Sequence, residues 1–304
     1  MVRSLSRIRP LKNKTIIVTG AGGMLSSAFQ ELLVGAKCKK SFFFSHAKLD
    51  VTRRKDVLSK SRLKPDIIIH CAANVNVDGC EDYPGECNRV QAQGMKNIVD
   101  LAKKSNAVVF YPQTFMIFGN KAGLITESDK PRPLSKYGKS KLMAEEVLVG
   151  NYRRYLIVRM GGMFGGFEKD KNFVGKFARH LSSCIKDGVK QKDVGDRLWQ
   201  PTYSRDLAYN SLVLLSMGKT GIYSMASHGE ASFYDVAKEI ADHFSLPISL
   251  RKVSSRNFPE KAKRPMRAIL SNAKLKSEGV DFQRGWKESL NEYLDGKYFR
   301  GLFR

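Results

Sequence analysis

The chain has 304 residues, of which 42% are hydrophobic, enough to bury one large core or a large core with a smaller partner. No apolar run approaches the roughly 20 residues that cross a bilayer, so we expect no membrane span. The formal net charge of +24 invites an anionic partner: nucleic acid, an anionic membrane or a phosphorylated substrate. The basic residues are spread along the whole chain without a recognised nucleic-acid-binding motif. We therefore interpret them as a solvated basic surface and expect no nucleic-acid partner.

The cysteines and the first residues bear on the compartment. Cysteine occurs at positions 38, 71, 80, 87 and 184, an odd number with no CxxC pair. This pattern predicts reduced thiols in a cytoplasmic protein and no metal site. Residues 1–14 contain five basic side chains and no acid. We expect residues 1–13 to form a disordered basic tail, with an organelle-targeting segment as the alternative.

Short apolar runs alternate with helical segments through the first half of the chain. Strands are predicted at 15–18, 41–44, 66–70, 107–111 and 155–158, and helices at 24–34, 86–104 and 134–149. A helix at 206–217 and a strand at 221–225 return to the same sheet. Such alternation predicts an α/β fold, a doubly wound parallel (Rossmann) sheet with helices on both faces.

The division into domains follows from where this alternation stops. We assign residues 14–160, together with 204–225, to a dinucleotide-binding domain. After Gly161 the pattern loosens, and we expect residues 161–203 and 226–304 to form a smaller α/β substrate-binding domain assembled from separated segments. Ligands of doubly wound sheets bind beyond the carboxyl ends of the strands.

A glycine turn follows the first strand directly. Gly20 and Gly23 are separated by two residues, and the position of the third glycine of the usual fingerprint is Ser26. A pyrophosphate needs close approach of the backbone and free N–H groups at a helix N-terminus, and glycines permit both. The small Ser26 side chain still allows the helix to pack on the sheet. The turn therefore predicts a dinucleotide cofactor.

The segment after the second strand indicates which dinucleotide binds. An acid at this point commonly holds the ribose 2′-hydroxyl of NAD, but residues 44–48 contain none. Basic side chains follow at Lys48, Arg53 and Arg54. We therefore expect the 2′-phosphate of NADP to be preferred.

The predicted helix at 134–149 carries a tyrosine and a lysine four residues apart. Tyr137 and Lys141 therefore share one face of the helix. A free tyrosine has a pKa near 10, and we expect the nearby ammonium to lower it so that Tyr137 can deliver a proton. Thr114, after the fourth strand, can donate a hydrogen bond to the same carbonyl oxygen. The three residues predict hydride transfer between a nicotinamide and a carbonyl.

These motifs resemble the extended short-chain dehydrogenase/reductases and, within them, the dTDP-4-dehydrorhamnose reductase family of nucleotide-sugar 4-keto reductases. The resemblance runs from about residue 14 to about 275. It rests on residues 19–25, 49–52, 65–73, 77–81, 137–141, 171–174, 201–203 and 206–208, and on Arg264-Pro265 with Leu270.

The resemblance implies roles for individual residues. The cofactor would touch Gly20, Gly23, Met24, Leu25, Asp50, Val51, Ala72, Ala73, Tyr137 and Lys141. Thr114, Tyr137 and Lys141 would form the catalytic set, and the substrate would contact Thr114, Asn172, Phe173 and Arg264. No metal is implied, and a homodimer is a possible assembly.

Two departures from the family lie where its substrate sits. The family usually has Ser-Thr-Asp-Tyr-Val-Phe after the fourth strand, whereas this chain has Phe115 and Met116 after Thr114. Phenylalanine and methionine side chains cannot act as an acid or a base, so we expect no dehydration of the substrate. A tryptophan common in the family corresponds to Gly162 here. The sequence therefore predicts an NADPH-dependent 4-keto reductase and leaves the nucleotide and sugar open. Two alternatives remain: a 4-epimerase that retains NAD, and a non-catalytic NADP-binding regulatory subunit.

Overall fold

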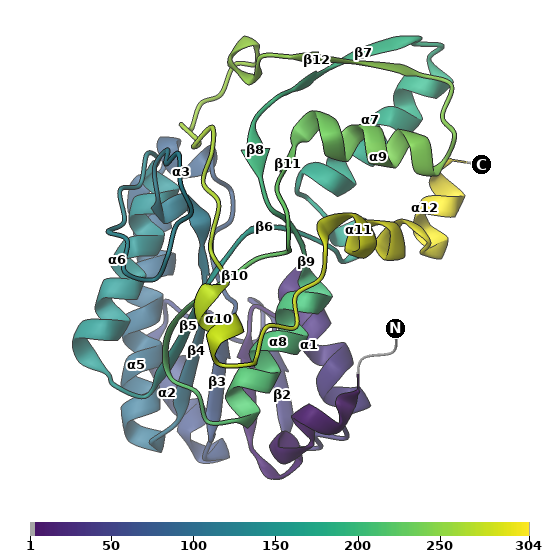
Figure 1. Cartoon of the computed structure of the whole chain (residues 1–304). Coiled ribbons are helices and arrows are strands. Elements are labelled where there is room, and N and C mark those ends of the chain that lie inside the picture. The colour runs from purple at the N-terminus through teal and green to yellow at the C-terminus, as the bar shows by residue number, and fades with distance from the viewer. Residues whose placement is uncertain (1–3, 304) are drawn as a thin grey trace.

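The computed structural model describes residues 4–303 and shows two lobes, with a helix-covered sheet at the lower left of Figure 1. The six strands pair in the order β10-β5-β4-β3-β1-β2, and every neighbouring pair is parallel. They are β1 (Ile16–Thr19), β2 (Ser41–Phe44), β3 (Ile67–His70), β4 (Val108–Thr114), β5 (Tyr155–Met160) and β10 (Gly221–Met225). The predicted doubly wound parallel sheet is confirmed.

Helices cover both faces of the sheet because successive strand residues point to opposite sides. In β3, Ile67 and Ile69 join the core beneath α1 (Met24–Gly35) and α8 (Ser204–Ser216). Ile68 points the other way, into the core beneath α5 (Gly94–Ser105) and α6 (Lys136–Asn151). The strand reads as a continuous apolar run because both of its faces are buried.

The single helix predicted at 86–104 is interrupted. The chain forms α3 (Gly79–Asp82), α4 (Pro84–Asn88) and a π-helical stretch, η3 (Arg89–Gln93), before α5 begins. The π-helical stretch turns Gln91 inward, and its side chain donates to the Asn74 carbonyl at 2.8 Å. A change of hydrogen-bond period cannot be read from apolar spacing, which looks the same through all three segments.

The prediction of a disordered tail is wrong for the residues that the structure describes. Leu5–Asn13 forms a 3-10 helix, η1, in which Ile8 and Leu11 are 0% and 2% exposed. The two side chains are three residues apart, the repeat of a 3-10 helix, so both face the core beside α1 and α8. The Ser216 hydroxyl also donates to the Arg7 carbonyl at 2.7 Å.

The prediction of five reduced thiols is also wrong. Cys80 and Cys87 form a disulfide, while Cys38, Cys71 and Cys184 are free. The chain reverses between α3 and α4, which brings the two Cα atoms to 5.5 Å, within the range of a disulfide. A sequence spacing of seven residues does not reveal this reversal.

The second lobe combines three two-stranded sheets with four helices. β6 (Gly162–Phe164) pairs with β9 (Pro201–Tyr203), β7 (Gln191–Gly195) with β12 (Ser249–Val253), and β8 (Leu198–Trp199) with β11 (Ala231–Ser232). The helices are α7 (Phe173–Lys186), α9 (Phe233–His243), α11 (Trp286–Leu294) and α12 (Lys297–Leu302). Aromatic residues such as Phe164, Trp199 and Tyr293 form its core.

Residues 204–225 return to the large lobe, where β10 joins the sheet and α8 covers it. Leu275 and Val280 also pack in this core, although they lie in a segment predicted to belong to the second domain. The domain boundaries themselves remain a prediction. Within residues 4–303, no helix is both long and apolar enough to cross a bilayer.

Candidate active site

The glycine turn after β1 is shaped by contact with the segment that follows β3. Gly20 has φ +71°, and a Cβ there would lie 2.6 Å from the Ala72 amide nitrogen. Only glycine fits both the backbone angle and this approach. The Ser26 hydroxyl, at the third fingerprint position, donates to the Gly20 and Gly23 carbonyls at 2.8 and 3.0 Å. Ser26 therefore stabilises the turn with two hydrogen bonds, whereas a glycine at this position would only permit close packing.

The N-terminus of α1 provides unpaired donors. Gly23 is its N-cap and supplies no side-chain oxygen to the first-turn N–H groups. Gly22, at φ +95°, has no atom within 4 Å of its Cβ position, so the space in front of the turn is open. Met24 and Leu25 begin the helix. Free backbone donors at the positive end of a helix dipole fit a pyrophosphate.

A buried polar contact fixes the end of β3 against β1. The Ala72 amide donates to the Thr19 hydroxyl at 3.2 Å, and Thr19 Oγ1 lies 2.8 Å from His70 Nδ1. Burial lowers the pKa of His70 to about 3, so the imidazole is neutral at physiological pH. This contact holds the backbone of Ala72 and Ala73 beside the glycine turn.

Asp50 and Val51 follow β2, at the same edge of the sheet. The Asp50 carboxylate accepts from the Thr52 hydroxyl and amide at 2.7 and 2.9 Å, and the hydroxyl bond lowers the Asp50 pKa. The Val51 carbonyl accepts from Asn97 at 2.8 Å.

The three cations expected near the 2′-phosphate differ in their surroundings. All three side chains are exposed. Arg54 donates to Asp100 at 2.9 Å, and Arg53 Nε lies 3.6 Å from Asp50. Among the described residues, Lys48 is therefore the one of the three without an acidic partner.

Tyr137 lies at the start of α6 and is 8% exposed. Burial raises its pKa to about 12, and a hydrogen bond with Thr114 only partly offsets this rise. The expected lowering of the Tyr137 pKa by Lys141 is therefore wrong for this structure, because desolvation is the larger effect. The phenol is protonated at neutral pH, as a proton donor must be.

Lys141 lies one helical turn further along the same buried face. Its ammonium donates to the Pro112 carbonyl at 2.9 Å and lies 4.0 Å from the centre of the Tyr111 ring. Burial lowers the Lys141 pKa to about 7, and the nearby Glu145 carboxylate opposes this shift. The Lys141 ammonium is therefore held by a backbone carbonyl and an aromatic ring, and no carboxylate among the described residues pairs with it.

Thr114 and Tyr137 are held in register by a close backbone contact. Thr114 ends β4, and its hydroxyl accepts from the Met116 amide at 3.2 Å, which caps the short turn η4 (Phe115–Ile117). Gly138 lies against the Met116 carbonyl so tightly that a Cβ would collide with it. Gly138 thus lets α6 approach η4 and brings Tyr137 to Thr114.

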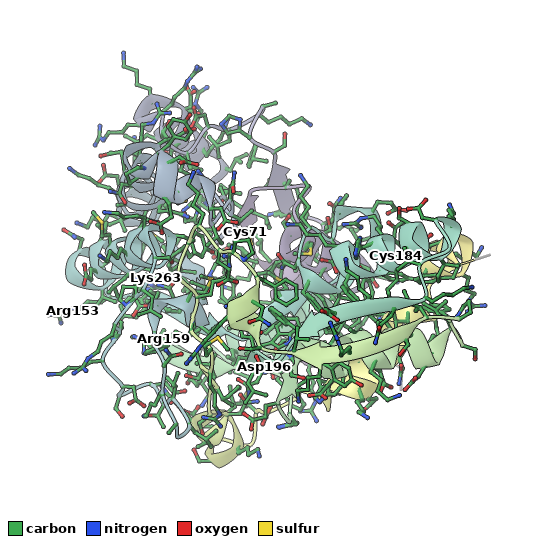
Figure 2. The ribbon with its side chains drawn as sticks, turned by 90° about the horizontal axis from the view of Figure 1, so that it is seen from above. Cys71, Arg153, Arg159, Cys184, Asp196 and Lys263 are labelled. Atoms are coloured by element: carbon green, nitrogen blue, oxygen red, sulfur yellow. A yellow bond between two sulfur atoms is a disulfide. The ribbon has the colours of Figure 1, made fainter. Side chains whose placement is uncertain are left out.

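A buried polar frame supports this arrangement from below. Gln113 donates to the Lys141 carbonyl at 3.0 Å and to Glu145 at 2.9 Å. Glu145 pairs with Arg159 at 2.5 Å, and their side chains are 6% and 5% exposed. Arg159 lies inside the body of the molecule in Figure 2. Sequence reasoning missed this frame, although a charged residue within the apolar run of β5 was an available signal.

Three of the expected substrate residues, Asn172, Phe173 and Arg264, have other partners in the structure. Asn172 is the N-cap residue of α7 and donates to the Met163 carbonyl at 2.7 Å, and the Phe173 ring stacks on Phe233 at 4.3 Å. Arg264 donates to both oxygens of Asp78, at 3.0 and 3.1 Å. Arg264 therefore joins the second lobe to the segment that follows β3. Between residues 4 and 303, no hydrogen bond, ion pair or ring contact joins any of the three to Thr114 or Tyr137.

Trp199 fills the space beside Gly162, the position where the family usually has tryptophan. A Cβ on Gly162 would collide with the Trp199 ring, which is 5% exposed. The indole also packs edge-on against Phe173 and Phe233, with ring centres 6.1 and 5.4 Å apart. The bulk missing at 162 is supplied by a residue from another strand.

A loop of the second lobe lies over the N-terminus of α1. A Cβ on Gly166 would lie 3.1 Å from Met24 Cγ, and Lys169 Nζ lies 3.3 Å from Ser27 Oγ. Lys169 is thus a cation beside the proposed phosphate-binding turn that sequence reasoning did not select. Within the described part of the chain, no cluster of histidine, cysteine and acidic side chains could hold a metal ion.

The chain is similar in sequence and in fold to known proteins. The dTDP-4-dehydrorhamnose reductase of Aggregatibacter actinomycetemcomitans is 29% identical, covering 90% of this chain and 97% of that protein. The crystal structure of dTDP-4-dehydrorhamnose reductase from Bacillus anthracis in complex with NADP is 27% identical, covers 93% of this chain and 99% of that chain, and has a TM-score of 0.84. The methionine adenosyltransferase 2 subunit beta of Pongo abelii is 26% identical over 95% of this chain and 91% of that protein.

The family resemblance is confirmed. The model of the RmlD substrate binding domain family matches residues 14–299, almost the whole of the described chain. The match includes the glycine turn, Thr114, Tyr137, Lys141 and the second lobe as far as residue 299. The chain belongs to the RmlD substrate binding domain family.

Proposed function

We propose that this protein is an NADPH-dependent reductase of the 4-keto group of a nucleotide-diphospho-6-deoxysugar. The observation that carries the proposal is the meeting of Thr114, a protonated Tyr137 and Lys141 at the carboxyl end of β4. The nearby N-terminus of α1, with its uncapped N–H groups, supports a dinucleotide at the same edge. The similarity to reductases, one of them in complex with NADP, supports the substrate and cofactor class.

The chain's own residues supply binding and proton transfer. The bound nicotinamide would supply a hydride. The turn at Gly20–Gly23 and the start of α1 would hold the pyrophosphate, and Lys141 would hold the nicotinamide ribose. Thr114 would donate a hydrogen bond to the substrate carbonyl oxygen, and Tyr137 would deliver its phenolic proton to that oxygen. The apolar Phe115 and Met116 offer no group to eliminate water.

Replacement of Tyr137 by phenylalanine tests the proposal. We expect Tyr137→Phe to lower kcat with a dTDP-4-keto-6-deoxysugar by about 10²–10⁴-fold, because the proton donor is lost, while NADPH still binds. Turnover is followed as NADPH oxidation, and NADPH affinity by fluorescence titration. Tyr155→Phe, in the following strand, is the matched control and should retain turnover. Full activity of Tyr137→Phe would refute the assigned role.

A second candidate, a non-catalytic NADP-binding regulatory subunit, is favoured by the similarity to methionine adenosyltransferase 2 subunit beta. It predicts NADPH binding without oxidation across a panel of nucleotide keto sugars, together with a stable protein partner. A 4-epimerase would instead be purified with tightly held NAD, which mass spectrometry of the released ligands would detect. Preference for NADPH over NADH in turnover separates the proposed reductase from both.

A further inference from the structure

The amino ends of all six parallel strands lie at one edge of the sheet, which we call the base. The base is opposite the edge that carries Thr114 and faces away from the second lobe, at the bottom of Figure 1. It is formed by the segments that lead into the strands: residues 12–15, 36–40, 60–66, 103–107, 150–154 and 217–220. Their charges are strongly asymmetric.

Every one of these segments contributes lysine or arginine. The cations are Lys12, Lys14, Lys37, Lys39, Lys40, Lys60, Arg62, Lys64, Lys103, Lys104, Arg153, Arg154 and Lys219. The acid within the six segments is Asp66, which lies 3.5 Å from Lys14 and also accepts from the Thr15 amide. The base therefore has a large positive charge that its own residues do not neutralise.

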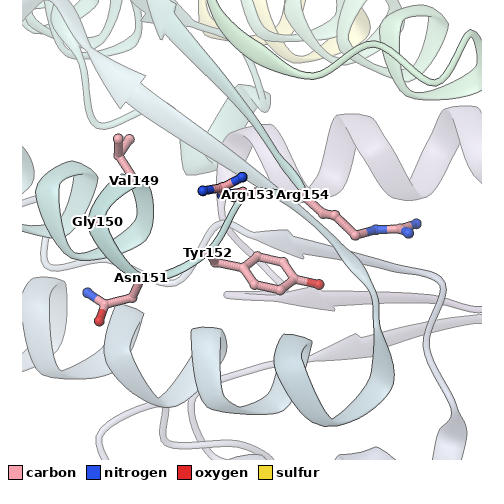
Figure 3. A pocket seen from close by; sticks show the side chains of 6 residues that line it. All are labelled: Val149, Gly150, Asn151, Tyr152, Arg153 and Arg154. Atoms are coloured by element: carbon pink, nitrogen blue, oxygen red, sulfur yellow. The ribbon is translucent and has the colours of Figure 1, made fainter.

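Most of these cations are exposed and free of ion pairs. Between residues 4 and 303, no acid lies within ion-pair distance of Lys39, Lys40, Lys103, Arg153 or Arg154, and all five are exposed. Arg153 and Arg154 line a hollow of about 510 Å³ at the end of α6. Figure 3 shows the side chains that line it. Nothing in the fold requires these positions to be cationic.

Several cations of the second lobe are paired with acids. Arg251 pairs with Asp193 at 2.7 Å, and Arg284 pairs with Asp206 at 2.9 Å. Lys238 pairs with Asp242 at 2.7 Å. The base segments, with thirteen cations and one acid, carry a local excess of twelve positive charges, half of the net charge of +24.

Apolar side chains are exposed among the base cations. Val34, Val149 and Met217 are 68%, 41% and 54% exposed, and each lies at the C-terminal end of a helix that runs down to the base. Phe42, in the edge strand β2, is 37% exposed. Cations interspersed with exposed apolar residues are the composition of surfaces that insert shallowly into the headgroup region of a bilayer.

The cations act together because they are close. Strands lie about 4.8 Å apart, so the six-stranded base is roughly 24 Å wide. The Debye length is about 8–10 Å at physiological salt, so neighbouring segments reinforce one another's potential. A broad positive face of this kind matches a flat anionic surface better than it matches a single nucleic-acid strand.

We propose that the base is a docking surface for the anionic headgroups of a lipid bilayer, with Val34, Phe42, Val149 and Met217 entering the interface. A single-stranded nucleic acid is less well matched, because stacking of successive bases requires several available aromatic rings, and among the described residues Phe42 is the one exposed ring at the base. Tyr152, the aromatic residue of the α6–β5 connection, instead donates its hydroxyl to the Ala107 carbonyl at 2.7 Å. In the docked orientation the catalytic edge faces away from the bilayer and stays open to solution.

The test is partition of the full-length protein onto vesicles. We expect binding to phosphatidylcholine vesicles containing about one third phosphatidylglycerol, and none to phosphatidylcholine alone. The variant K39Q/K40Q/R153Q/R154Q should partition on the order of several hundredfold more weakly, because each of the four base cations contributes a factor of about five. The variant V34S/M217S should weaken partition several-fold without changing its salt dependence.

The matched control removes four exposed cations from the second lobe, as K186Q/K190Q/R256Q/K297Q, and has the same net charge. It should bind nearly as the natural chain does, and thermal denaturation should confirm that both variants are folded. Equal losses in the two variants would show attraction by net charge alone and overturn the proposal. So would failure to bind anionic vesicles at low salt, or binding of RNA or duplex DNA without vesicle binding.

Discussion

Two arginines at opposite ends of β5 show how differently this fold uses the same side chain. Arg153 precedes the strand, is exposed and has no ion pair among the described residues, whereas Arg159 is 4% exposed and pairs with Glu145 at 2.5 Å. In Figure 2 one projects from the molecule and the other lies within it. At the catalytic edge charge is buried and partnered, and at the base it is exposed and available.

Among the substitutions that test this difference, we expect the largest loss of stability at Arg159. We expect Arg159→Met to lower the free energy of unfolding by about 3–5 kcal/mol, because Glu145 would remain buried without its partner. Arg153→Met should change it by no more than about 0.5 kcal/mol. Urea denaturation measures both. Replacing both partners, as E145L/R159M, should recover much of the loss; equal effects at 153 and 159 would contradict the distinction.

A pair of glycines in α6 provides a second comparison. Gly138 lies at the catalytic end against the Met116 carbonyl, while Gly150 lies near the base with no atom within 4 Å of its Cβ position. Gly138→Ala should lower the free energy of unfolding by about 1–3 kcal/mol through overpacking. Gly150→Ala should raise it by up to about 1 kcal/mol through helix propensity. Thermal and urea denaturation should give opposite signs, and matching signs would argue against the proposed close contact.

Lys141 leads to a prediction about the pH dependence of stability. The Lys141 pKa of about 7 lies below the value of about 10.4 expected for an unfolded lysine. Between these values the unfolded state binds more protons, so this lysine makes stability rise with pH from about 7 to about 10, and it contributes no slope below 7. Lys141→Met should remove that rise. Parallel stability–pH curves for Lys141→Met and the natural chain would show that Lys141 is not desolvated.

Sequence patterns predicted the large sheet because its strands are short, doubly buried apolar runs between helices. They also selected Thr114, Tyr137 and Lys141, whose roles as catalytic residues remain a prediction. They did not predict that burial would outweigh charge at Tyr137, because desolvation depends on residues such as Met116 that approach only in the folded chain. The Cys80–Cys87 disulfide was missed for a related reason, since it depends on a chain reversal at residue 83.

The prediction for the η1 segment was wrong for a different reason. The basic composition of residues 1–13 predicted a disordered tail, yet two apolar side chains three residues apart suffice to anchor Leu5–Asn13 on the core. Charge describes what most side chains of a segment do, whereas a few apolar contacts determine where its backbone lies.

Trp199 and Gly162 share a single space, which constrains how this chain can diverge from its relatives. An indole at both positions is sterically forbidden, because Trp199 already occupies the volume above Gly162. A chain without an indole at either position would have a void in its aromatic core. A tryptophan at position 162 of this scaffold therefore requires a smaller residue at position 199 to be introduced with it.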